Sequence, residues 1–274
     1  MAAITLLTRR RLLAAAFATG ALLVGCASTP DTAPSSEARA AIAPTGKLRV
    51  AVYPGSPTSL VERAPLSQMR GVSVDLGRAL ADRLGVPAQM EVYARQQEAF
   101  SALQRGEADF MVTNATAERV QLADFAPPLV DLELGVLVPA GGRVDAVEHM
   151  DQPGITIGVS QGSSSERALG ARLKQAKLRT FPSLDDAAAA LRAREIDAFA
   201  TNKGILFELA DKVPGARVLE GRWGSEHLAP ALPKGRAPAG LAYLRGFSDE
   251  VRRNGELARA TERAGLRGTA PPAP

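Results

Sequence analysis

Two polar stretches of this sequence have the residue types and spacing of an anion-binding site. Ser163 to Glu166 has the Ser-x-x-Glu spacing of a capping box, so we expect a helix to begin near Ser163. The apolar run 155–159 precedes it and reads as a strand. The first free N–H groups and the positive end of the helix dipole would therefore face outward from a strand end. Capping alone would account for these serines, and anion binding at Ser163 and Ser164 is the further prediction.

Arg119 is the second candidate, because it lies just beyond another apolar run that ends in Thr113-Asn114. A guanidinium at a strand end can hold a carboxylate through two parallel hydrogen bonds. The alternative is a surface salt bridge with Glu118 or Asp124, which is the usual role of an arginine.

The sequence shows no convincing catalytic set, and we expect a binding protein without cofactor or metal rather than an enzyme. His149 and His227 each stand beside an acidic residue and are isolated from one another. There is no Gly-x-Ser-x-Gly nucleophile motif and no metal-ligand spacing. The single cysteine, Cys26, lies near the N-terminus.

An internal repeat indicates how these residues are positioned. Residues 102–114 align without a gap to residues 190–202, and both copies contain Glu-x-Asp followed by Thr-Asn. Strand-like and helix-like segments alternate along the chain, which predicts α/β layers. We therefore expect two similar lobes, each with an open α/β sheet. Ligands bind outside the carboxyl ends of the strands in such sheets, which brings Asn114, Thr201 and Asn202 to a shared cleft.

The N-terminal segment reads as an export signal. Arg9 to Arg11 precede an apolar run over 12–24, which is too short to span a membrane, and Cys26 follows it. We expect a signal peptide over 1–25, a lipidated Cys26 and a flexible linker over 26–45. A chance cysteine after an ordinary signal is the alternative, and the general and twin-arginine routes both remain open.

Charge excludes one class of partner. Three of the 33 basic residues belong to the export signal, which contains no acidic residue, so the remaining chain is nearly neutral. No basic stripe is left to neutralise phosphates, and we expect no nucleic-acid partner.

Five stretches together resemble the bacterial periplasmic solute-binding proteins for polar amino acids (family 3): 46–52, 71–80, 117–128, 157–164 and 195–198. The resemblance implies the type II two-lobed periplasmic-binding-protein fold, in which each lobe is an open, mostly parallel sheet flanked by helices. It places lobe 1 at 46–137 plus 228–270 and lobe 2 at 138–227. The chain would cross between lobes near 135–138 and 228–231.

The resemblance also implies roles for the site residues. Arg119 matches the carboxylate-binding arginine of the family, Ser163 and Ser164 match its carboxylate-binding helix start, and Asn114 stands where the family usually has Ser or Thr. Two features depart from the family. Asn202 replaces the aspartate that pairs with the α-ammonium group of the ligand, and the loop 54–59 lacks an aromatic residue that stacks on the ligand.

These features predict a monomeric solute-binding subunit of an ABC importer, anchored in the periplasm as a lipoprotein. Its partners would be a small carboxylate-bearing or amino-acid-like ligand and a permease in the inner membrane. Two alternatives remain open: a secreted dehydratase-like enzyme acting on prephenate-like acids, and a sensory binding protein that signals without transport.

Overall fold

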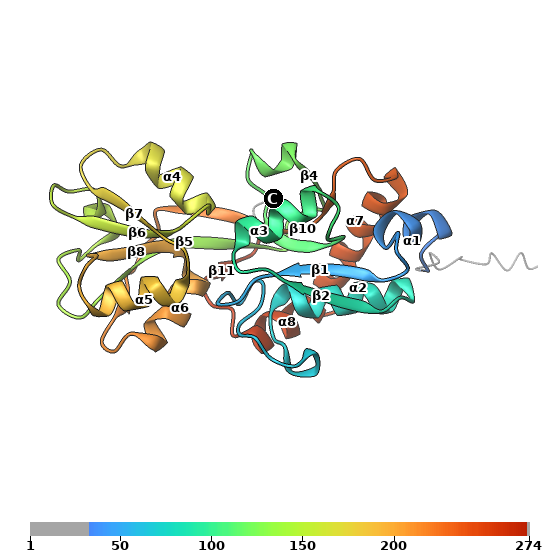
Figure 1. Cartoon of the computed structure of the whole chain (residues 1–274), viewed down its shortest axis with the longest axis horizontal. Coiled ribbons are helices and arrows are strands. Elements are labelled where there is room, and N and C mark those ends of the chain that lie inside the picture. Colours follow the sequence, from blue (N-terminus) through green and yellow to red (C-terminus); the bar gives the residue numbers. More distant parts are fainter. Residues whose placement is uncertain (1–32, 273–274) are drawn as a thin grey trace, which may run out of the picture. The chain divides into compact units, whose positions relative to one another are not determined.

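The computed structural model describes residues 33–272, which form a two-lobed α/β fold (Figure 1). The predicted signal peptide and Cys26 lie outside the described residues. The helices are α1 Ser36–Ile42, η1 Leu66–Gln68, α2 Val72–Leu84, α3 Gln96–Gln104, η2 Arg119–Gln121, η3 Val147–Met150, α4 Ser164–Arg172, α5 Leu184–Arg192, α6 Lys203–Lys212, α7 Pro238–Arg253 and α8 Glu256–Ala264.

The strands form two hydrogen-bonded sets. In the first, β1 pairs in parallel with β2; in the second, the strand order is β3-β10-β5-β8-β6-β7. The strands are β1 Leu48–Val52, β2 Ala88–Val92, β3 Met111–Asn114, β4 Ala123–Phe125, β5 Val130–Val138, β6 Thr156–Ser160, β7 Lys177–Phe181, β8 Ala198–Asn202, β9 Arg217–Val218, β10 Gly224–Pro233 and β11 Thr269–Ala270.

Helix α2 illustrates how the sequence builds the first lobe. Its apolar residues recur every fourth position, and Leu76, Leu80 and Leu84 are all buried. Gly85 ends the helix in the left-handed conformation, with φ 64°. Gly77 lets α2 approach β1 closely, because a Cβ there would lie 2.7 Å from a methyl group of Val50. This packing fixes β1, and with it the strand end that faces the second lobe.

Strands β5 and β10 connect the two lobes. They pair antiparallel from Gly224–Leu134 to Leu228–Val130, and β10 then continues against β3. Along β5, Leu132 belongs to the core of the first lobe and Leu134 to a core of the second. The residue limits predicted for each lobe stay a prediction, but the crossing itself is a pair of neighbouring strands (Figure 1).

The repeated segments form the same local structure in both lobes. In the first copy, the Asp109 carboxylate accepts from Arg49 N at 3.1 Å, and Asp109 N donates to Arg49 O. In the second, the Asp197 carboxylate accepts from Thr156 N at 2.8 Å, and Asp197 N donates to Thr156 O. Each aspartate therefore ties its turn to the start of the neighbouring strand, β1 or β6.

The predicted flexible linker differs from the structure at its carboxyl end. Residues Ser36–Ile42 form α1, which Ser35 caps by accepting from Ala38 N at 3.0 Å. Ala38 and Ile42 are buried, and α1 packs against α7. The composition is rich in alanine, a strong helix former, and its apolar residues share one face, so this part is ordered. Between residues 33 and 272, no helix is long and apolar enough to cross a membrane.

Candidate functional site

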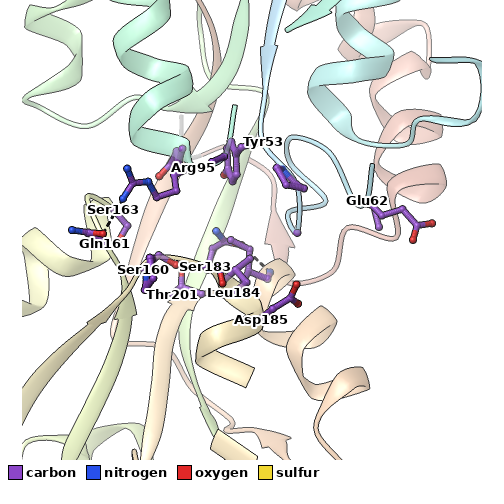
Figure 2. A pocket seen from close by; sticks show the side chains of 18 of the residues that line it. Tyr53, Glu62, Arg95, Ser160, Gln161, Ser163, Ser183, Leu184, Asp185 and Thr201 are labelled. Atoms are coloured by element: carbon purple, nitrogen blue, oxygen red, sulfur yellow. Dashed lines mark hydrogen bonds between the residues drawn. The ribbon is translucent and has the colours of Figure 1, made fainter. Parts of the chain in front are cut away.

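A cavity of about 360 Å³ lies between the two lobes, lined by residues of both. It brings together five of the predicted site residues: Asn114, Ser163, Ser164, Thr201 and Asn202. Figure 2 shows Tyr53 and Arg95 of the first lobe on one side of it and Ser163 and Thr201 of the second lobe on the other. The strand-end rule for open α/β sheets thus located the cavity from sequence.

The start of α4 forms the second-lobe wall. Ser163 caps the helix, its hydroxyl accepting from Glu166 N at 3.1 Å, which confirms the predicted capping interaction. The Glu166 carboxylate accepts in turn from Gly162 N. The positive end of the helix dipole therefore lies at the cavity, where it favours a negatively charged group.

Asn202 has a structural role that the sequence analysis did not identify. It caps α6, which begins at the next residue, by accepting from Ile205 N through Oδ1 at 3.1 Å. Its carbonyl oxygen is thereby used inside the protein. The two donors of the amide NH2 group and the second lone pair of that oxygen are what Asn202 has left to offer a ligand.

Asn114 lies at the opposite wall and makes a contact between lobes. Its Nδ2 donates to the carboxylate of Glu226 on β10, and lies 3.5 Å from the hydroxyl of Ser164 at the start of α4. Ser164 also hydrogen-bonds to Glu226. Burial raises the pKa of Glu226, while its bonds to Ser164 and Asn114 and the nearby Arg119 oppose that rise.

Arg119 is buried behind the cavity wall and does not line the cavity. Its side chain is 1% exposed; Nη1 donates to the hydroxyl of Thr113 at 2.9 Å, and the guanidinium carbon lies 4.8 Å from the ring centre of Phe100. Nε and Nη2 are buried and have no hydrogen-bond partner among the described residues. Burial lowers the pKa of this guanidinium.

The alternative of a surface salt bridge for Arg119 is wrong. Glu118 pairs with Arg167 at 2.8 Å, and the Asp124 carboxylate accepts from Gly235 N. A buried cation without an ion-pair partner is costly, so an arginine in this state calls for another explanation.

Three residues of the site were missed by the sequence analysis. Tyr53 lies directly before the loop 54–59, is buried and lines the cavity, so the first lobe does supply an aromatic ring. Arg95 of the first lobe donates to Gln161 of the second at 2.9 Å, closing one side of the cavity. Tyr53 could have been predicted as a site residue from sequence, since it directly follows the carboxyl end of a strand. Arg95 and Gln161 carry no such signal, because their pairing depends on how the lobes approach.

Two carboxylates line the cavity among the residues that the structure describes. They belong to Glu62 and Asp185, and both side chains are exposed. Within residues 33–272, no three His, Cys, Asp or Glu residues are grouped so that they could hold a metal ion. His227 instead pairs with Asp131 at 2.5 Å, outside the cavity lining.

Two proteins of known name are similar to this chain in sequence. The glutamine-binding protein of Geobacillus stearothermophilus is 24% identical over 220 residues, which cover 74% of this chain and 84% of that protein. The membrane-bound lytic murein transglycosylase F of Maricaulis maris (strain MCS10) is 33% identical over 167 residues. The match covers 59% of this chain but only 36% of that enzyme, so this chain spans about a third of its length.

Solved structures and a family model agree with the two-lobed fold. The ancestral amino acid-binding protein AncCDT-1, a precursor of cyclohexadienyl dehydratase, superposes with a TM-score of 0.70 at 25% identity, covering 82% of this chain and 97% of that one. The family model of the bacterial extracellular solute-binding proteins, family 3, matches residues 48–265. With that match over most of its length, the chain belongs to the bacterial extracellular solute-binding proteins, family 3.

Proposed function

We propose that the protein is the extracytoplasmic binding subunit of an ABC importer and captures a small carboxylate-bearing or amino-acid-like ligand in the cavity between its lobes. The names of its relatives support this class, since they include a glutamine-binding protein. In this proposal the protein acts as a monomer in the periplasm, is held to the membrane by a lipid on Cys26 and delivers its ligand to an inner-membrane permease.

Arg119 is the observation that carries the proposal. Two of its buried nitrogens, Nε and Nη2, have no hydrogen-bond partner among the described residues. An unsatisfied buried donor costs about 1–3 kcal/mol, and more when the group is charged. Nε and one terminal nitrogen form an edge of the guanidinium that can take a carboxylate through two parallel bonds. The cavity-lining Asn114 directly follows Thr113, the partner of Arg119 in β3. A ligand carboxylate at this end of the cavity would lie next to Asn114 and supply negative charge to the buried Arg119, which does not itself line the cavity.

The exposure of the cavity carboxylates favours binding over the dehydratase alternative. An acid that protonates a substrate near neutral pH is tuned by burial or by a neighbouring charge. Glu62 and Asp185 are both exposed to solvent, and Asn202 cannot donate a proton as an acid does. Burial does raise the pKa of Glu226, but Glu226 does not line the cavity. Delivery to a permease and signalling without transport use the same site, and only a partner protein distinguishes them.

A thermal-shift screen tests the proposal, using L-amino acids, their matched deamino acids and the corresponding neutral amides. Carboxylates that bind are expected to raise the stability by about 2.7 kcal/mol at 100 times their dissociation constant. Neutral amides should have little effect. Arg119→Met should abolish the gain, and should itself fold with equal or higher stability, because it removes a buried and unpaired charge.

Arg179→Met is the matched control, since Arg179 is a partly exposed arginine that is paired with Glu195 and lies outside the cavity lining. It should keep the response of the wild type. If no carboxylate or amino acid stabilises the wild-type protein, the proposal is wrong. If Arg119→Met responds as the wild type does, the ligand is not held by Arg119.

A further inference from the structure

Glu226 already occupies the surroundings predicted for a ligand carboxylate. It lies on β10 where that strand crosses between the lobes, opposite Leu132 of β5. Asn114 of the first lobe donates to its carboxylate, Ser164 of the second lobe hydrogen-bonds to it, and the charge of Arg119 acts on it. Arg119 and Ser164 are two of the residues expected to receive the carboxylate of a ligand, and Asn114 lines the cavity with Ser164.

We propose that Glu226 is a specificity-determining residue, a built-in carboxylate that competes with carboxylate ligands for Asn114, Ser164 and the field of Arg119. This inference rests on the proposed function. Glu226 does not line the ligand cavity, whereas Asn114 and Ser164 do, so the two carboxylates would approach the same partners from opposite sides. A ligand carboxylate can therefore interact with all three residues only when Glu226 is protonated or its hydrogen bonds to Asn114 and Ser164 are broken.

The hydrogen bonds of Asn114 show why the competition is direct. Its NH2 group carries two hydrogens; one is donated to Glu226, and Ser164 lies within reach of the other at 3.5 Å. While Glu226 is ionised, Asn114 therefore has only its carbonyl oxygen left for a ligand. An acceptor oxygen repels a carboxylate, and this end of the cavity is then unsuited to one.

Charged groups from several neighbouring elements bear on Glu226. Arg119 from η2 and Arg167 from α4 favour its ionised form, and the buried Tyr53 at the end of β1 lies within electrostatic range. Glu118 is neutralised by Arg167, and His227, the next residue of β10, is paired with Asp131. Burial outweighs these partners and raises the pKa of Glu226.

A second cavity gives Glu226 a route for protons that avoids the ligand. This cavity, of about 580 Å³, is lined by Glu226 and His227 together with Glu118, Arg167 and Trp223. Ser164 lines both cavities and stands between them. Glu226 can therefore exchange its proton from the far side while a ligand fills the cavity between the lobes.

The sign of the pH dependence follows from the order of the pKa values. A ligand carboxylate beside Glu226 raises the pKa of Glu226 further, since like charges disfavour ionisation. Between the free and bound pKa values, binding takes up a proton, and affinity falls as pH rises, by at most about tenfold per pH unit. Below the free pKa the dependence disappears, because Glu226 is protonated in both states.

Calorimetric titrations between about pH 5 and pH 8 test this inference. The probes are glutarate, L-glutamine and L-arginine as carboxylates, with glutaramide as a neutral relative of glutarate. The wild-type protein should bind carboxylates more weakly at the higher pH and take up protons on binding, which shows as a dependence of the heat on the buffer. Glu226→Gln should bind them at least about tenfold more tightly at about pH 8, without the pH dependence.

Two further variants make the outcome decisive. Glu226→Met removes the carboxylate without adding a donor, and should also bind the carboxylates more tightly than the wild type. Glu195→Gln removes a carboxylate that lines neither cavity, and should behave as the wild type. Glutaramide should bind equally to all four proteins.

Different experimental outcomes contradict the proposed function and the inference about Glu226. If the wild type binds carboxylates and both Glu226 variants show the same affinity and pH dependence, Glu226 does not compete and this inference is wrong, while the proposed function stands. If neither the wild type nor any Glu226 variant binds a carboxylate, both the proposed function and this inference are wrong.

Discussion

The two copies of the repeated segment both end in Thr-Asn, but the two asparagines have different structural roles. Asn202 caps the helix that begins at Lys203, with Oδ1 accepting from Ile205 N. Asn114 is followed by a loop rather than a helix, and its NH2 group reaches the hinge carboxylate of Glu226. An identical strand end thus becomes a helix cap or a contact between lobes, depending on the residues that follow it.

The aspartates of the two copies make the same backbone contact in different surroundings. Asp109 is 0% exposed and is paired with Arg49 at 2.7 Å and Arg236 at 2.9 Å. The Asp197 side chain is 15% exposed, and its partner Arg143 is 62% exposed. The repeat therefore preserves a structural motif, whereas the surrounding lobe decides how much free energy that motif contributes.

The largest expected effect separates these two aspartates. Asp109→Ala should lower the free energy of unfolding by about 3–5 kcal/mol, because it leaves two partly buried arginines without their carboxylate. Asp197→Ala should cost about 1–2 kcal/mol, since it removes one backbone hydrogen bond and one solvent-exposed ion pair. Urea denaturation of both variants measures the difference.

Asp109→Asn and Asp197→Asn are the matched controls, since asparagine keeps an acceptor for the backbone N–H and removes only the charge. The gap between the two positions should persist in this pair. Equal losses at both positions would show that burial does not distinguish the two lobes.

The same substitution at the two asparagines should give opposite results. Asn114→Asp places a carboxylate against Glu226, and should cost about 2 kcal/mol at neutral pH. Like charges raise the folded-state pKa values, so the loss should disappear as the pH falls below them. Asn202→Asp should change stability by less than about 0.5 kcal/mol, because aspartate caps a helix as well as asparagine does. It should also strengthen binding of L-amino acids, by adding a negative charge to the cavity.

Unfolding curves at neutral and acidic pH measure the stability part, and titration with L-glutamine measures the binding part. A loss for Asn114→Asp that does not change with pH would contradict the assigned contact with Glu226. Tight binding of L-glutamine by the wild type would show that Asn202 does not limit amino acid binding.

Much of the fold could be predicted from sequence, because its signals are local. The capping spacing of Ser163 and Glu166 located the start of α4 within one residue, and the repeat located two equivalent strand ends. The strand-end rule then brought both ends to one cavity. The family resemblance is confirmed by the match over residues 48–265.

The chemistry of the site could not be predicted, because it depends on contacts between distant segments. Glu226 lies 112 positions from Asn114 along the chain, and only the crossing of β10 brings it to the site. The surroundings of Arg119 depend likewise on distant segments, since it lies against the ring of Phe100 and within electrostatic range of Tyr53. No local spacing reports such contacts, whereas a helix cap is complete within four residues.

The smallest expected effect concerns the turn of each copy. Gly106 and the equivalent Arg194 both have positive φ, 69° and 56°, and Arg194 is the one residue other than glycine with positive φ among residues 33–272. Such a conformation costs an ordinary residue about 1 kcal/mol and costs glycine almost nothing. The Arg194 side chain offsets part of this cost by donating to Ala140 O at 2.9 Å.

Arg194→Gly should therefore raise the free energy of unfolding by about 0.5 kcal/mol over the wild type. It should exceed Arg194→Ala by about 1 kcal/mol, because alanine keeps the backbone strain and loses the hydrogen bond. Urea denaturation of the three proteins separates backbone strain from the side-chain contact. An Arg194→Gly protein no more stable than Arg194→Ala would mean that the second turn tolerates its side chain without strain, and that the two copies differ less than their φ angles imply.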